Sequence, residues 1–299
     1  MHNTFNLNMN MNKAILTVAA LSCFTTSVFA QKSATVQTVI KAEDDFVKLA
    51  AKKGIKEAFL AVADPEGIVF KPEAIKITEF YGKIDKQPGT LTWQPKFART
   101  SANGDMAFTA GPYVYQNGKT DDDKVFGDYV SLWKLDPATN KLRLLIDLGI
   151  QHPQSDKIQL TDVKEPASTE RVAPSTDPFN PKKIIIDNDR QFNQGLRIST
   201  VGAYKEFFLP EGHYYFPGFE PMVGTDKTLQ FVANQAIVIS AENISAERAS
   251  SNDLAYSYGR ARIQKGNIVS NYNYVRIWER DDKHRWNILL EIFSAIENE

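Results

Sequence analysis

Hydrophobic positions along the chain follow helical spacing first and strand spacing afterwards. Phe46, Leu49 and Ala50 share one face of a helix predicted over Glu43–Ala51, and Ile55–Ala63 reads as a second short helix. Alternating apolar runs then predict strands over 68–70, 91–97, 107–115, 126–133 and 142–148. Asn103-Gly104 and Asn117-Gly118 are typical of tight hairpin turns. The pattern predicts an α+β fold in which helices precede an antiparallel sheet and pack on one of its faces.

The same pattern occurs a second time. Asn103–Gly111 resembles Ser251–Gly259, Asp128–Trp133 resembles Asn273–Trp278, and Leu142–Leu148 resembles Trp286–Ile292. The blocks keep their order, which indicates an internal duplication. Five of the 14 prolines fall within Gln151–Pro181, and this richness predicts a semi-stiff linker. The expected organisation is a signal peptide over 1–30, a first domain over 31–152, a linker over 153–182 and a second domain over 183–299.

The N-terminus reads as an export signal. Lys13 precedes an apolar run from Ala14 to Phe24, and Val28 and Ala30 place small or aliphatic residues before a cut after Ala30. The run is too short to span a bilayer, which takes about 20 apolar residues. We expect a bacterial protein that is periplasmic or secreted, with a lipid-modified Cys23 as the alternative.

Composition and charge exclude several classes of function. The chain has 35 basic and 36 acidic side chains and a net charge of −1, so no footprint for nucleic acid is present. Its one cysteine lies in the predicted signal, so the mature chain can form no disulfide and no thiol nucleophile. The remaining histidines, His152, His213 and His284, have no zinc-ligand spacing. No phosphate-cradling glycine loop, dinucleotide fingerprint or nucleophile elbow occurs, and we expect no metal and no cofactor.

Several motifs together resemble a known family. Glu57-Ala-Phe-Leu60, the strand from Gly104 to Gly111, Tyr129-Val-Ser-Leu-Trp133 and the closing strand ending Leu145-Ile-Asp147 resemble the SnoaL-like branch of the nuclear transport factor 2-like superfamily. The resemblance covers nearly all of both copies. It implies cone-shaped α+β domains, each with N-terminal helices packed on a bent antiparallel sheet around an apolar pocket. It also implies a wide choice of function, from isomerases, dehydratases and cyclases to proteins that only bind ligands or partners.

The ketosteroid isomerases of that superfamily place a general-base Asp on the strand after the second helix. The corresponding segments here, Ile68–Pro72 and Tyr214–Pro217, contain no carboxylate. Asp147 and Glu291 instead recur in the last strand of each copy, where alternation puts Asp147 on the face of Leu145 and Gly149.

An acid among apolar strand residues that faces a pocket can serve as acid or base, with Tyr129 or Tyr274 nearby. The alternative is an outward-facing acid paired with Arg143 or Arg276. Arg276 is expected, with Arg260 and Arg262, in a surface charge array. Asp105 and Asp253 follow hairpin turns and are expected to serve those turns.

We expect this protein to bind a small apolar or amphipathic molecule in one or both pockets. The alternatives are a lyase or isomerase, and a structural module whose copies pack sheet to sheet with filled cones. An internal pseudo-dimer and a homodimer both fit the linker. The first pocket is predicted to be lined by Phe70, Phe80, Tyr81, Trp93, Phe108 and Trp133, and the second by Tyr214, Phe216, Tyr256, Tyr258 and Trp278.

Overall fold

A computed structural model of the protein describes residue 1 and residues 34–157, 159–166 and 182–296. The predicted signal peptide and its cut after Ala30 lie outside the described residues. The described residues from Ala34 onward belong to one compact unit that contains two β-sheets. We call the part up to residue 166 the N-terminal half and the part from residue 182 the C-terminal half.

The N-terminal half begins with two helices and continues with a sheet of eight strands in the order β2-β1-β7-β6-β5-β4-β8, where β3 also pairs with β5. A 3-10 turn, Asp121–Asp123, precedes β6. The elements are α1 (Val36–Lys53), α2 (Ile55–Val62), β1 (Ala63–Phe70), β2 (Ala74–Lys76), α3 (Ile77–Lys83), β3 (Thr90–Trp93), β4 (Phe97–Thr100), β5 (Met106–Gln116), β6 (Lys124–Asp136), β7 (Lys141–Gln151) and β8 (Asp162–Lys164).

The C-terminal half has the same order of elements, with one long strand in place of β3 and β4. Its sheet has six strands in the order β10-β9-β14-β13-β12-β11. The elements are α4 (Lys183–Ile198), α5 (Thr200–Phe207), β9 (Phe208–Tyr215), β10 (Met222–Val223), α6 (Thr225–Gln235), β11 (Ile237–Arg248), β12 (Leu254–Lys265), β13 (Ile268–Arg280) and β14 (Trp286–Ala295).

Neither sheet is purely antiparallel, which corrects the sequence-based expectation. β1 runs parallel to β7, with Val69 beside Asp147, and β9 runs parallel to β14, with Tyr214 beside Glu291. Hairpin signals reveal only pairs of strands that are close in sequence. A parallel pair needs a long connection, and here the intervening helix and strands supply it.

Several short elements, among them β2, α3 and β8, were not predicted from the sequence. α3 has only seven residues, and its apolar signal is the single pair Ile77 and Tyr81, both buried. β8 lies within the segment predicted to be a linker, yet it pairs with β4 and thereby extends the first sheet. An ion pair of 2.9 Å between Arg99 Nη2 and Asp162 Oδ2 fixes that pairing. The segment predicted to be a linker, 153–182, thus contains a strand of the first sheet.

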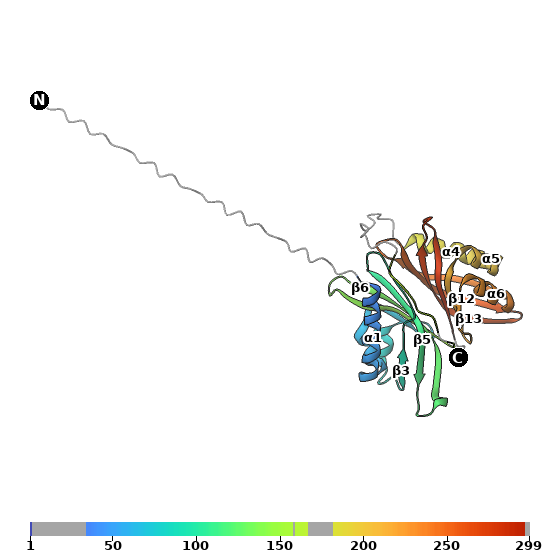
Figure 1. The fold of residues 1–299 in the computed structure, drawn as a ribbon, viewed down its shortest axis with the longest axis horizontal. Coiled ribbons are helices and arrows are strands. Elements are labelled where there is room, and N and C mark those ends of the chain that lie inside the picture. The colour runs from blue at the N-terminus through green and yellow to red at the C-terminus, as the bar shows by residue number, and fades with distance from the viewer. Residues whose placement is uncertain (2–33, 158, 167–181, 297–299) are drawn as a thin grey trace. The chain divides into compact units, whose positions relative to one another are not determined.

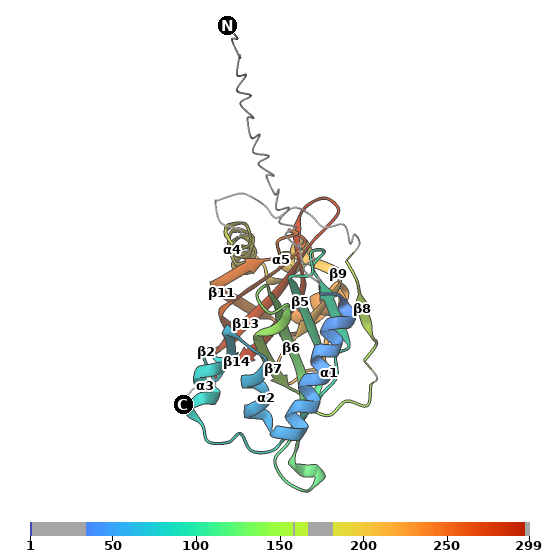
Figure 2. The same ribbon diagram turned by 90° about the vertical axis from the view of Figure 1, so that its left-hand side faces the viewer.

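The two sheets pack face to face, and the helices lie on the outer side of each sheet (Figures 1 and 2). One continuous apolar core joins them, to which β4–β7 contribute residues such as Phe97 and Val130 and β12–β14 contribute residues such as Val275 and Leu290. This agrees with the sheet-to-sheet packing that the sequence analysis gave as one alternative. A stable separation of the halves would expose this core to water.

Asp105 and Asp253 join the halves by a reciprocal pair of hydrogen bonds. The Ala102 backbone N–H donates to Asp253 Oδ2 at 2.8 Å, and the Ser250 backbone N–H donates to Asp105 Oδ2 at 2.8 Å. Each Asp also meets a Ser of its own turn, so the expected turn role is present and a second role across the halves is added.

Candidate functional site

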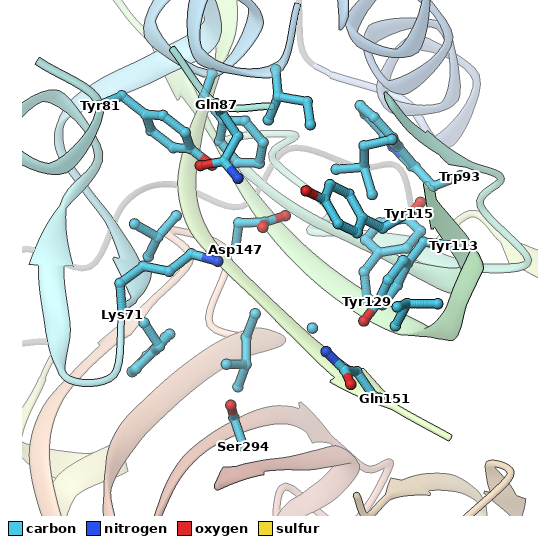
Figure 3. A pocket seen from close by; sticks show the side chains of 18 of the residues that line it. Lys71, Tyr81, Gln87, Trp93, Tyr113, Tyr115, Tyr129, Asp147, Gln151 and Ser294 are labelled. Atoms are coloured by element: carbon cyan, nitrogen blue, oxygen red, sulfur yellow. The ribbon is translucent and has the colours of Figure 1, made fainter. Parts of the chain in front are cut away.

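The N-terminal half contains a cavity of about 620 Å³ between its helices and its sheet (Figure 3). This volume is within the range of small-molecule sites. Ser294 and Ala295 at the end of β14 add a wall from the C-terminal half. Most of the lining is apolar or aromatic and comes from α1, α2, α3, β1, β3, β5 and β6, including Phe46, Phe59, Tyr81, Trp93, Tyr113 and Tyr115.

Asp147 on β7 faces this cavity. The pairing of β6 with β7 shifts between Ile146 and Leu144, so one residue of β7 bulges out of the ladder. Leu144 therefore packs with the helices, whereas Leu145 and Ile146 both pack in the core between the sheets. The expectation that Leu145 shares a face with Asp147 is wrong because simple alternation does not hold across a bulge.

The carboxyl group of Asp147 is half-buried in the cavity wall. Ser131 Oγ on the neighbouring strand donates a hydrogen bond of 2.9 Å to its Oδ2. Burial raises the pKa of Asp147 to about 6, while the Ser131 hydrogen bond and the positive charge of Lys71 act in the opposite direction. Figure 3 shows the Lys71 amine pointing toward the Asp147 carboxyl group from the other side of the cavity.

Tyr129, the predicted partner of Asp147, lies in the same cavity wall and is 5% exposed. Within the described residues its hydroxyl has no partner at ordinary hydrogen-bond geometry. Burial and the nearby Glu43 carboxyl group hold the pKa of Tyr129 well above its usual value. The phenol therefore stays protonated near neutral pH and offers a donor to a bound molecule.

Glu43 on α1 is a buried acid that the sequence analysis did not identify. Its carboxylate accepts hydrogen bonds from Trp133 Nε1 at 2.8 Å, from Trp93 Nε1 at 2.6 Å and from the Thr109 hydroxyl. Burial raises its pKa to about 7, although the three hydrogen bonds oppose this rise. Glu43 thereby fixes Trp93, which lines the cavity. Its position three residues before Phe46, on the apolar face of α1, was the available signal.

Three of the six aromatic residues predicted for the first pocket, Phe70, Tyr81 and Trp93, line the cavity. The other three do not. Phe80 is half-buried against Tyr81, Trp133 is fully buried and donates to Glu43, and Phe108 packs on Phe97 in the core between the sheets. Phe108 differs because successive β5 side chains face opposite sides, and Thr109 is the neighbour that faces the helices.

In the C-terminal half, Arg276 occupies the place that corresponds to Ser131. Both stand two residues after the Tyr of the shared motif, and each pairs across the sheet with the acid of the last strand, Asp147 or Glu291. Arg276 is fully buried, which corrects its expected place in a surface charge array. The prediction of a surface position is wrong because the Arg276 side chain points toward the helices rather than toward solvent.

Arg276 holds a closed network of charges. Its Nε donates to Glu291 Oε1 at 2.6 Å, and its Nη1 donates to Asp189 Oδ1 at 2.8 Å. Tyr204 donates to the other oxygen of Glu291 at 2.5 Å, and Tyr274 donates to Asp189 at 2.7 Å. Glu291 and Tyr274 are thus engaged with protein groups, and the predicted acid/base role does not fit them.

The residues predicted to line a second pocket pack in cores instead. Tyr214 and Trp278 are fully buried among the helices and sheet of the C-terminal half, where Phe216 is half-buried among other aromatic rings. Tyr256 and Tyr258 lie at the core between the sheets. None of the five lines the cavity with Asp147. The Arg276 network fills the space beside Tyr214 and Trp278, whereas Tyr256 and Tyr258 face the other side of β12, on which Ser257 is the residue that faces the helices.

The described part of the chain has no group of three or more His, Cys, Asp or Glu side chains placed to hold a metal ion. Among the helices of that part, none is both long enough and apolar enough to cross a membrane.

No family model matches the sequence, and no curated protein is similar to it. Several solved structures are similar to part of the chain. A ketosteroid isomerase-like protein from Erwinia carotovora atroseptica is 14% identical, with a TM-score of 0.36, over 40% of this chain and 100% of that protein. A nuclear transport factor 2-like protein from Cytophaga hutchinsonii is 13% identical, with a TM-score of 0.34, over 40% of this chain and 100% of its own length. An epoxide hydrolase of M. tuberculosis is 12% identical, with a TM-score of 0.31, over 38% of this chain and 78% of that one. The activities in these names are those of the similar proteins, and each alignment covers less than half of this chain.

Proposed function

We propose that this chain is an exported tandem nuclear transport factor 2-like protein whose N-terminal half binds a small, largely apolar molecule that carries a polar group. The observation that carries the proposal is the cavity of about 620 Å³, in which aromatic walls surround the single carboxyl group of Asp147. An apolar pocket with few polar groups is the usual form of a small-molecule site. The equal order of elements in the two halves supports the tandem arrangement.

The C-terminal half serves as a built-in structural partner in this proposal. Its place for a ligand is taken by Arg276, Glu291 and Asp189, all fully buried and paired with one another. Its sheet covers the sheet of the N-terminal half and completes the core between them.

Native mass spectrometry of residues 31–299, purified gently from the exported fraction, tests the proposal. We expect an additional mass that leaves on denaturation. Leu91→Trp fills part of the cavity and should remove that mass. Val238→Trp, at a strand position that is 50% exposed, is the matched control and should retain it. A bare mass that stays unchanged with lipid, steroid and polyketide panels would refute ligand binding and favour a structural module.

Acid/base catalysis as a lyase or isomerase is the second candidate, with Asp147 and Tyr129 as the reacting groups. It is favoured by the pKa of Asp147, which burial raises to about 6, because a carboxyl group with a pKa near the working pH exchanges protons efficiently. Asp147→Asn separates the two candidates. If the protein is a catalyst, the Asp147→Asn variant should still bind the ligand found by mass spectrometry but should no longer convert it. If the wild type does not convert that ligand, catalysis is excluded and ligand binding is the function that stands.

A further inference from the structure

Lys71 is the cationic side chain that reaches the cavity beside Asp147. It begins the turn between β1 and β2, where the Lys71 backbone N–H donates to the Glu73 carbonyl oxygen at 2.8 Å. Within the described residues no carboxylate oxygen lies within 4.0 Å of its Nζ, so no salt bridge neutralises it. Lys71 is exposed, and its Nζ lies 6.0 Å from the centroid of the Phe80 ring. Its charge is therefore not neutralised by a carboxylate and can be reached by a molecule in the cavity.

The turn that carries Lys71 is held by the other half of the chain. Asn273 Nδ2 on β13 donates to the Pro72 carbonyl oxygen at 2.6 Å. Arg260 on β12 contacts Glu73 Oε2 through Nε at 3.0 Å and through Nη2 at 2.8 Å. These contacts fix the residues on the C-terminal side of Lys71.

Two further features make this a built contact. Phe70, directly before Lys71, packs edge to face on Tyr258 of β12 with ring centroids 6.0 Å apart. Asn273 is 1% exposed, so its hydrogen bond to Pro72 is sheltered from competing water. The exposed ion pair of Arg260 adds less by itself, because solvent screens it.

We propose that Asn273 and Arg260 are positioning residues that hold Lys71 opposite Asp147, so that the C-terminal half supplies the cavity with a fixed cation for an oxygen acceptor of the ligand. This inference rests on the proposed function, because it assumes that this cavity is the ligand site. It narrows the ligand to an apolar, ring-sized compound with a carbonyl or carboxylate oxygen, which Lys71 would bind through a charge-assisted hydrogen bond.

The first test needs no ligand. The carboxyl carbon of Asp147 is followed by NMR through a pH titration of the full mature chain. Lys71→Met removes the cation and should raise the Asp147 pKa above its wild-type value by about half a unit or more. Asn273→Leu should reproduce a large part of that rise, and Asn271→Leu, an exposed position on the same strand, is the matched control and should produce none.

Arg260→Gln gives a second perturbation at an exposed position, where folding is not at risk, and should give a smaller rise. The exchanged pair Arg260→Glu with Glu73→Arg should restore the wild-type value. The positioning role is overturned if Lys71→Met raises the pKa while Asn273→Leu and Arg260→Gln both leave it unchanged.

The second test measures binding of 2-acetylnaphthalene and 2-ethylnaphthalene, which differ in one carbonyl oxygen. Wild type should bind the ketone roughly tenfold more tightly, as expected for a hydrogen bond to a charged donor. Lys71→Met should remove that preference, and Asn273→Leu should reduce it. Equal affinity of the two compounds for wild type overturns the acceptor role. If neither compound binds, the acceptor role is overturned, whereas the cavity proposal is decided separately by native mass spectrometry and the positioning role by the titration.

Discussion

Replacing Glu43 by Gln is expected to flatten the pH dependence of stability between about pH 4.5 and pH 7. In the folded chain, burial raises the Glu43 pKa to about 7, above its ordinary value of 4.5. Below pH 4.5 the group is protonated in both states. As the pH rises, the unfolded chain loses this proton first, so the free energy of unfolding falls until the pH passes about 7.

The size of the effect follows from the same two values. A difference of 2.5 units between about 7 and 4.5, at about 1.4 kcal/mol per unit, corresponds to about 3.5 kcal/mol of stability lost by the wild type across this range. The Glu43→Gln variant has no titrating proton at this position, so its free energy of unfolding does not fall in this way as the pH rises. It has a constant penalty instead, because an amide can accept fewer hydrogen bonds than the carboxylate from Thr109, Trp93 and Trp133.

The assay is urea denaturation of wild type and Glu43→Gln at intervals from about pH 4 to pH 8. The difference between their unfolding free energies should shift by about 3.5 kcal/mol in favour of the variant as the pH rises. Asp44→Asn, at the exposed neighbouring position, is the matched control and should run parallel to wild type. Parallel profiles for Glu43→Gln as well would refute the reasoning, since the three donors would then outweigh burial and leave Glu43 ionised.

Three further changes have defined outcomes. Arg276→Met should lower the free energy of unfolding by about 3–5 kcal/mol near pH 7, because it leaves a buried carboxylate without its cation. The loss should be smaller near pH 5, because burial raises the pKa of Glu291 and the group can take up a proton. An equal loss at both pH values in urea denaturation would contradict this. Ser131→Ala should raise the pKa of Asp147 above about 6 by removing a hydrogen bond to the carboxylate, and an unchanged NMR titration would exclude that cause. Asp253→Ala should cost about 1–3 kcal/mol by leaving a backbone N–H of the other half unpaired, whereas Asp282→Asn, at an exposed site, should be neutral in the same denaturation assay.

Elements whose signals are local could be predicted from the sequence. The helix at Phe46 is present but begins earlier than predicted, at Val36, and the helix from Ile55 and the strands before and after Asn117 lie where periodicity places them. The tight turn predicted at Asn117-Gly118 is wrong, because β5 ends at Gln116 and β6 begins at Lys124 after a 3-10 turn, whereas Gly104 has the positive φ expected of its turn. These signals work because a helix face or a hairpin is specified by neighbouring residues. The α+β class follows from them, and the element order shared by both halves corresponds to the repeated blocks.

The features that decide the site are not local. Asp147 faces the cavity because β7 contains a bulge near Leu145, and a bulge depends on its partner strand as well as on its own residues. The β1–β7 pairing that puts Val69 beside Asp147 joins strands far apart in the sequence. Glu43 could be found only as an acid on an apolar helix face, and its partners Trp93 and Trp133 lie 50 and 90 residues away.

One pair of aligned residues explains why the N-terminal half has a cavity and the C-terminal half has a filled core. Ser131 and Arg276 occupy the same place in the shared motif, each opposite the acid of the last strand. The short serine side chain makes one hydrogen bond to Asp147 and leaves the rest of that space open. The long arginine side chain crosses the corresponding space and joins Glu291 to Asp189, so that the acid is paired with a protein cation.

This difference gives a physical reason for keeping two halves. A cavity leaves its lining without packing partners and destabilises the half that contains it. In the C-terminal half the side chains of the Arg276 network fill the corresponding space, so this destabilisation does not arise there. This half also shares a continuous apolar core with the N-terminal half. Its β13 and β14 also hold Pro72 and supply Ser294 to the cavity wall. The filled half can therefore stabilise the open one and complete its cavity wall, which a free single domain could not do for itself.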